Sequence, residues 1–127
     1  MKRLFLGLAL SILAGVACAQ QGCTQVATLT PEQFKKKMTV DASSIIVLDV
    51  RTPEEWNKGH LRQARLMNFM RNDFATHADT LNKSKTYLLY CASGGRSYDA
   101  AELLCQKGFK ALSLSGGYRD LKALGAE

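Results

Sequence analysis

The sequence predicts an α/β domain with a central, mostly parallel β-sheet flanked by helices. Short apolar runs alternate with helix patterns along the chain, which is typical of β–α–β connections. Residues 45–48 and 86–90 are almost continuously apolar, as strands are when helices cover both faces of a parallel sheet. The chain of 127 residues is long enough for one domain with its own core and too short for two.

Two helix starts carry the same capping pattern. Thr30 can cap a helix, Pro31 suits its first position, and Gln33 can close a capping box. The same pattern recurs at residues 52–55, where Glu55 is the third helical residue. The expected strands are 26–29, 45–48, 64–69, 86–90 and 111–114, and the expected helices are 31–38, 53–58, 73–82, 97–107 and 118–124.

Residues 1–19 have the three-part pattern of a secretory signal peptide. Lys2 and Arg3 precede an uncharged apolar stretch over residues 4–16, and small residues follow up to Ala19. The stretch is shorter than the roughly 20 apolar residues that a membrane span needs, which favours cleavage over a retained anchor. We therefore expect cleavage after Ala19 and an exported, periplasmic protein.

Two alternatives stay open for the N-terminus. One is a retained membrane anchor, and the other is a lipoprotein that carries lipid on Cys18 or Cys23. The residues that precede each cysteine match the usual lipoprotein signal poorly. After the signal peptide we expect a flexible segment over residues 20–25 and a single domain over residues 26–127.

The charge pattern favours small anionic partners. The formal net charge is +6, and the basic residues are scattered along the chain. Their only run, residues 35–37, lies on an expected helix and is typical of a solvated face, so we expect no nucleic acid partner. A contact with a membrane is expected only if the chain is lipidated.

The cysteines predict at least one free thiol. Cys23, Cys91 and Cys105 would remain after cleavage, and an odd number cannot all pair within one chain. Cys105 falls among leucines of an expected helix and is expected in the core, whereas Cys23 is expected to be a spare thiol in the N-terminal segment. A mobile segment that carries Cys23 to the active site is the alternative. No Cys-x-x-Cys pair or Cys/His cluster is present, so we expect no metal and no cofactor.

The segment that follows the strand at 86–90 carries the chemistry. Cys91 stands at the carboxyl end of that strand, where open α/β sheets bind their ligands. A glycine-containing loop and a helix start follow, and their N–H groups together with Arg96 favour a thiolate. We expect the sulfur of Cys91 to face these groups, with an anion-binding loop made of Ala92, Ser93, Gly94, Gly95, Arg96 and Ser97. The alternative is a small buried cysteine at a strand end.

Four motifs stand in the order known from one family. They are Leu-Asp-Val-Arg at 48–51, Thr-Pro-Glu-Glu-Trp with Gly-His-Leu at 52–61, Cys-Ala-Ser-Gly-Gly-Arg-Ser at 91–97, and Leu-Ser-Gly-Gly at 114–117. With these motifs, the chain resembles the rhodanese-like domains over about residues 26–125. It departs from their usual pattern at 63–66 and at Leu121, where a tryptophan is common.

The resemblance implies a sulfurtransferase. Cys91 would take sulfane sulfur from thiosulfate or a persulfide, and the resulting Cys91 persulfide would give it to a thiol or cyanide. Asp49 and Arg51 are supporting candidates that either position the loop or substrate or form a structural ion pair. His60 is expected to be a hydrogen-bonded scaffold residue rather than a general base.

Two rival functions share this fold. Protein tyrosine phosphatases place five residues between cysteine and arginine, and phosphatases and arsenate reductases of the rhodanese fold also have longer loops. Here only four residues separate Cys91 from Arg96, which favours sulfur transfer. A binding module without catalysis is the other rival, but inactive relatives usually lack the cysteine.

Overall fold

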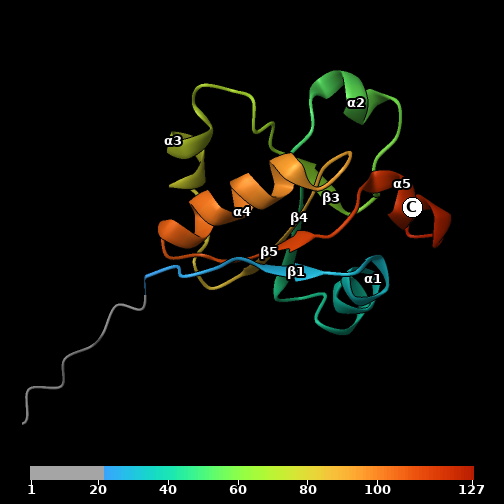
Figure 1. The fold of residues 1–127 in the computed structure, drawn as a ribbon, viewed down its shortest axis with the longest axis horizontal. Helices are drawn as coiled ribbons and strands as arrows, with labels where there is room; N and C mark the ends of the chain where they lie inside the picture. Colours follow the sequence, from blue (N-terminus) through green and yellow to red (C-terminus); the bar gives the residue numbers. More distant parts are fainter. Residues whose placement is uncertain (1–21) are drawn as a thin grey trace, which may run out of the picture.

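Five parallel strands form the central sheet of the computed structural model, which describes residues 22–127 (Figure 1). Their order across the sheet is β1-β5-β4-β2-β3, and every neighbouring pair is parallel. The predicted α/β fold class is therefore confirmed. The strands are β1 (Ala27–Leu29), β2 (Ile45–Asp49), β3 (Ala64–Leu66), β4 (Thr86–Tyr90) and β5 (Lys110–Leu114). The helices are α1 (Pro31–Val40), α2 (Pro53–Asn57), α3 (Phe74–Ala78), α4 (Gly95–Gln106) and α5 (Tyr118–Ala123).

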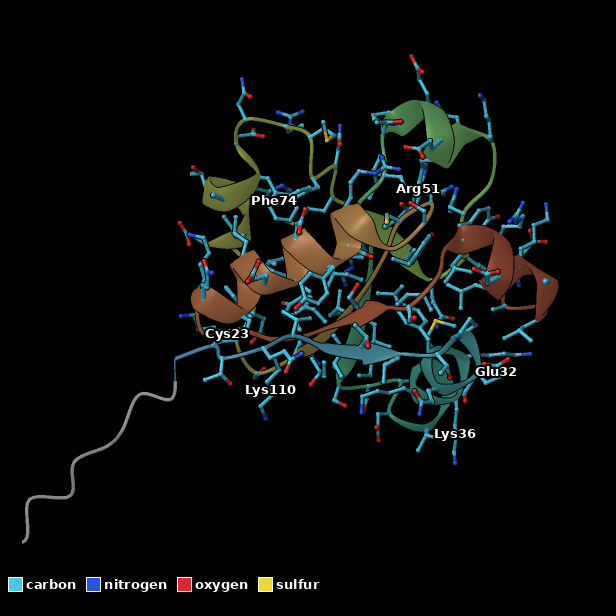
Figure 2. The ribbon with its side chains drawn as sticks, in the orientation of Figure 1. Cys23, Glu32, Lys36, Arg51, Phe74 and Lys110 are labelled. Atoms are coloured by element: carbon cyan, nitrogen blue, oxygen red, sulfur yellow. A yellow bond between two sulfur atoms is a disulfide. The ribbon has the colours of Figure 1, made fainter. Side chains whose placement is uncertain are left out.

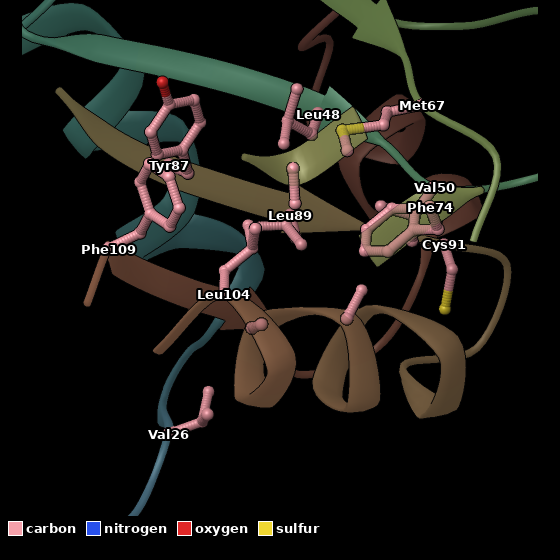
Figure 3. Close-up of a cluster of buried hydrophobic side chains, with 13 residues drawn as sticks. Val26, Leu48, Val50, Met67, Phe74, Tyr87, Leu89, Cys91, Leu104 and Phe109 are labelled. Carbon is pink, nitrogen blue, oxygen red and sulfur yellow. The ribbon is translucent and has the colours of Figure 1, made fainter. Parts of the chain in front are cut away.

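The two faces of the sheet carry separate hydrophobic cores. Alternate residues of a strand point to opposite faces, and β4 shows this directly, since Leu88 and Tyr90 belong to one core and Leu89 to the other. Helices α3 and α4 cover the face of Leu89, where Phe74 and Leu104 pack (Figure 3). Helices α1 and α5 cover the opposite face. Burial on both faces explains the continuous apolar pattern of β2 and β4.

Both predicted capping boxes are present. Gln33 Oε1 accepts a hydrogen bond from the Thr30 N–H at 2.9 Å, and Thr30 Oγ1 accepts one from the Gln33 N–H at 3.2 Å. Thr52 and Glu55 repeat the arrangement at the start of α2. These caps satisfy N–H groups that the first helical turn leaves without partners. The second box also places the Glu55 side chain beside α4.

Four predicted boundaries differ from the structure by two residues or more, and one of them is the end of α1, which lies at Val40 rather than at 38. The strand expected over 64–69 ends at Leu66, although Met67 and Phe69 still donate backbone hydrogen bonds to the end of β2 and the residue after it. The helix expected over 73–82 spans only Phe74–Ala78, because Thr80 donates both its N–H and its hydroxyl to the His77 carbonyl and closes a tighter turn. The helix expected from 97 already begins at Gly95, which shortens the loop after β4.

A disulfide between Cys23 and Cys105 corrects two predictions. Cys23 is not a spare thiol, and Cys105 is not simply a core residue, because their sulfurs are bonded across 82 positions of sequence. The bond ties the segment before β1 to the last turns of α4, at the end remote from the Cys91 loop (Figures 1 and 2). Cys23 therefore does not reach the Cys91 loop.

Several predictions about the N-terminus lie outside the described residues. The signal peptide over 1–19, its cleavage after Ala19 and the lipid alternative at Cys18 all belong to this part of the chain. The boundaries proposed for the segment over 20–25 and the domain over 26–127 stay predictions. Within residues 22–127, no helix is long and apolar enough to cross a bilayer.

Candidate active site

Cys91 directly follows β4 at the carboxyl edge of the sheet and is fully buried. Its sulfur leaves the hydrophobic cluster and is directed toward the loop that opens α4 (Figure 3). The Gly94 N–H donates a hydrogen bond to this sulfur at 3.0 Å, and Ser97 Oγ lies 3.5 Å from it. The expected orientation of the thiol toward the loop amides is therefore observed. The alternative, a small buried cysteine that only fills the core, does not explain this orientation.

Opposing influences set the pKa of the Cys91 thiol. Burial is the largest of them and raises the pKa, because a thiolate loses hydration in the interior. The hydroxyl of Ser97 and the backbone N–H groups of Ser97, Ser93 and Gly94 stabilise the thiolate and lower it. The donors together outweigh burial, and the pKa lies below its ordinary value. A lower pKa leaves more of Cys91 as thiolate, and the thiolate is the form that attacks sulfur.

A titration should show this lowered pKa. The ultraviolet absorbance of the Cys91 thiolate, taken as wild type minus Cys91→Ser, is expected to rise with a midpoint below the roughly 8.5 of a free cysteine. The thiolate and its reactivity should be present above that midpoint and should disappear as the pH falls through it. A midpoint above that of free cysteine would mean that burial outweighs the loop donors.

The turn after β5 packs against the Cys91 loop. The Tyr118 N–H donates a hydrogen bond to the Cys91 carbonyl at 2.9 Å. A Cβ atom at Gly117 would lie 1.6 Å from the carbonyl oxygen of Ala92, so only glycine fits there without a shift. Gly94 adopts a positive φ of 105° and lies close to the carbonyl oxygen of Gly116. A side chain at Gly94 would strain the backbone and crowd this oxygen. The two glycine-rich segments thus fix each other.

Gly117→Ala should damage the site through this contact. Since either the turn or the loop must move, we expect the free energy of unfolding to fall by about 2 kcal/mol and the predicted sulfur transfer to fall roughly tenfold or more. Thermal unfolding and kcat/KM measure the two effects. Gly22→Ala is the matched control, because a Cβ there meets no atom within 4 Å. An unchanged kcat/KM in Gly117→Ala would show that this packing does not position the loop.

Arg96 differs from its predicted arrangement. Its guanidinium donates hydrogen bonds to Glu55, from Nη1 to Oε2 at 2.7 Å and from Nη2 to Oε1 at 2.8 Å, rather than to the loop or to the Cys91 sulfur. The pair joins the first turn of α4 to α2. Arg96 therefore contributes a charge that is already compensated by a carboxylate.

Asp49 and Arg51 form a buried ion pair. Arg51 Nη2 lies 2.7 Å from Asp49 Oδ2, and the same nitrogen donates to the Gly59 carbonyl at 2.7 Å. The guanidinium also lies 4.4 Å from the centre of the Tyr118 ring. These contacts match the structural ion pair of the two predicted alternatives. The pair connects the end of β2 to the turn that backs the Cys91 loop.

The Trp56–His60 contact likewise belongs to the scaffold. The two rings are stacked with centroids 3.4 Å apart, and His60 Nδ1 lies 2.9 Å from the Trp56 carbonyl. Both residues hold the short α2 segment in shape.

Two residues of the site were missed in the sequence. Ser113 is fully buried, and its hydroxyl donates to Ser97 Oγ at 2.9 Å, which orients the hydroxyl beside Cys91. A serine within the apolar strand at 111–114 was a usable signal. Glu55 was predicted only as a helix cap, and its contact with Arg96 depends on tertiary packing. Ala92 and Ser93 lie exposed, whereas Gly94, Gly95, Arg96 and Ser97 form the helix start.

Within the described part of the chain, no group of three or more His, Cys, Asp or Glu side chains is arranged to hold a metal ion.

Comparison with known proteins identifies the family of this chain. The sequence model of the family described as "Rhodanese-like domain" matches residues 30–124. This chain belongs to that family. A Bacillus subtilis protein, YtwF, which carries a provisional sulfurtransferase name, is 30% identical over 93 residues, which cover 73% of this chain and 87% of that protein. A tRNA sulfurtransferase of Pyrobaculum aerophilum is 41% identical over 69 residues, and these span 54% of this chain but only 14% of that enzyme.

Solved rhodanese-like structures share the fold. A Thermoplasma volcanium rhodanese-related protein matches with a TM-score of 0.69 and 24% identity, over 80% of this chain and 95% of its own. A Staphylococcus aureus rhodanese-like domain protein matches with a TM-score of 0.67 and 27% identity, over 76% and 91%. A Rhodopseudomonas palustris protein, provisionally described as a tyrosine phosphatase, has a TM-score of 0.71 at 22% identity over 80% and 83%, which shows a common fold alone.

Proposed function

We propose that this rhodanese-like protein is a sulfurtransferase that carries sulfane sulfur as a persulfide on Cys91. The observation that carries the proposal is the environment of the sulfur, which lies 3.0 Å from the Gly94 N–H at the start of α4. A thiolate held there is a nucleophile, and the same donors would stabilise the negative persulfide that it forms. Relatives with sulfurtransferase names support the general activity.

The proposed reaction has two steps. The Cys91 thiolate attacks the outer sulfur of the donor, a new S–S bond forms on Cys91, and the donor's own S–S bond breaks. The leaving group keeps the electron pair and departs as sulfite from thiosulfate or as a thiolate from an organic persulfide. An acceptor thiolate or cyanide then attacks the terminal sulfur and regenerates the Cys91 thiolate.

Paired assays test this function. Thiocyanate formation from cyanide is measured with thiosulfate and with glutathione persulfide, beside hydrolysis of an aryl phosphate. We expect sulfur transfer and no phosphate hydrolysis, since only four residues separate Cys91 from Arg96. Hydrolysis without transfer would favour a phosphatase, and a folded protein inactive in all assays would favour a binding module.

We further propose that the protein is exported to the periplasm. The pattern of residues 1–19 supports this, and so does the Cys23–Cys105 disulfide, since disulfides persist mainly in oxidising compartments. A disulfide-bonded Cys23 cannot carry lipid, so a lipid anchor would have to use Cys18. Mass spectrometry of protein recovered from the periplasm should give Gln20 as the first residue. An intact Met1, or lipid on Cys18, would contradict cleavage after Ala19.

A further inference from the structure

Glu55 and Arg96 form the charged pair that joins α2 to the helix of the active-site loop. Two parallel hydrogen bonds of 2.7 and 2.8 Å connect their side chains, and such forked pairs fix geometry as well as charge. The side chains are only 31% and 27% exposed, so water screens the pair less than it would screen one on an open surface. Arg96 is held by the α2 carboxylate one turn from the loop that cradles Cys91.

Glu55 stays ionised under all ordinary conditions. The hydrogen bond from Arg96 is the largest influence and lowers the pKa of the Glu55 carboxyl to about 2, although burial acts in the opposite direction. The Thr52 N–H and hydroxyl also donate to Glu55 Oε2, each at 3.0 Å. The carboxylate is therefore a permanent feature of this side of the site.

Neither arginine of the predicted site offers an uncompensated charge to a ligand. Arg96 faces Glu55, and Arg51 faces Asp49 and the Gly59 carbonyl. An anion that approaches Cys91 meets the loop amides, whereas the charge of the Arg96 guanidinium is already shared with Glu55 through two of its N–H groups. This arrangement differs from a cradle in which a free arginine faces the substrate.

We infer that the Glu55–Arg96 pair sets the choice of sulfur donor, so that organic persulfides are preferred over thiosulfate. The inference rests on the proposed sulfurtransferase function. Thiosulfate brings two negative charges to a thiolate, and the sulfite that leaves also carries two negative charges. A persulfide in its RSSH form brings no charge on its reacting sulfur atoms, keeps its proton on the transferred sulfur, and releases a single thiolate. A neutralised Arg96 penalises the first reaction more than the second.

Glu55→Gln isolates the charge of this residue. Glutamine can keep the capping box, because Gln33 closes the equivalent box of α1 in this same chain. It cannot reproduce the forked ion pair, so the charge of Arg96 becomes available. Glu54→Gln is the matched control, since Glu54 lies in the same turn but is exposed and is not part of the pair. Glu55→Asp keeps the negative charge beside Arg96.

The measured quantity is the ratio of kcat/KM for thiosulfate to kcat/KM for glutathione persulfide. We expect the wild type to favour the persulfide, and Glu55→Gln to raise the ratio about tenfold, chiefly through a lower KM for thiosulfate. The gain should shrink at high salt, because it comes from a newly exposed charge. Glu54→Gln should leave the ratio unchanged, and Glu55→Asp should stay closer to the wild type than Glu55→Gln.

The other results separate failure of this inference from failure of the proposed function. A wild type that transfers sulfur from neither donor overturns both. A wild type that is active but favours thiosulfate, or an active Glu55→Gln whose ratio is unchanged, overturns the inference alone. A second measurement needs no variant: the wild-type kcat/KM for thiosulfate should change less than about twofold with salt, since the arginine charges are compensated. A steep fall with salt would show that a free cation binds the donor.

Discussion

Replacing Cys91 by serine is expected to abolish sulfur transfer while the fold stays intact. Serine has nearly the same size and can still accept the hydrogen bond from the Gly94 N–H that holds the sulfur at 3.0 Å. A hydroxyl at its ordinary pKa is not ionised by these donors, and no residue observed next to Cys91 is a general base. The variant therefore lacks both the nucleophile and the atom that carries the persulfide.

Rates with thiosulfate and with glutathione persulfide measure this effect, and they should fall to the uncatalysed background for both donors. Thermal unfolding shows that the variant is folded, with a Tm near that of the wild type. Ser115→Ala is a suitable control for a change in a nearby turn, because Ser115 is exposed. Transfer at more than about one-tenth of the wild-type rate would mean that another group carries the sulfur.

Removing the Cys23–Cys105 disulfide should cause the largest loss of stability. The bond closes a loop over 82 positions, and loops of this length restrict the unfolded chain by about 4 kcal/mol. The double variant Cys23→Ser/Cys105→Ser is expected to lose about this much free energy of unfolding, which lowers Tm by roughly 15 °C or more. It also frees β1, a three-residue strand that pairs only with β5 at the edge of the sheet.

Activity separates this structural role from a chemical one. Below its Tm the double variant should transfer sulfur at a near wild-type rate, because the disulfide lies at the opposite end of α4 from Cys91. A reducing agent should lower the Tm of the wild type to that of the double variant and leave the variant itself unchanged. A fall in activity without a fall in Tm would indicate that Cys23 or Cys105 takes part in sulfur transfer.

Local patterns in the sequence predict most of the fold and the position of Cys91. The capping boxes at Thr30 and Thr52 are local, and the structure has both. The continuous apolar runs of β2 and β4 predict burial on both faces, which places Cys91 at the carboxyl edge of a parallel sheet. The orientation of its sulfur follows from the glycine-containing loop and the helix start that come next.

Local patterns could not predict contacts between residues that are distant in the sequence. Nothing local joins Cys23 to Cys105 or Glu55 to Arg96, since each pair meets only after the sheet has brought α4 beside the N-terminal segment and α2. Glu55 stands at the third helical position, where its role in the capping box is sufficient to explain it. The local pattern therefore gave no indication of its second contact, with Arg96. Thr80 ended α3 early through a side-chain hydrogen bond that competes with the helix.

Mass spectrometry of the wild-type protein tests the central claim most directly. The protein is incubated with glutathione persulfide or thiosulfate, freed of donor and digested without reductant, and each cysteine peptide is weighed. We expect one added sulfur atom on the peptide that contains Cys91, no addition to the disulfide-linked Cys23–Cys105 peptide, and loss of the added sulfur when cyanide is supplied. A Cys91 peptide that gains no sulfur from either donor, in a folded protein, would contradict the account.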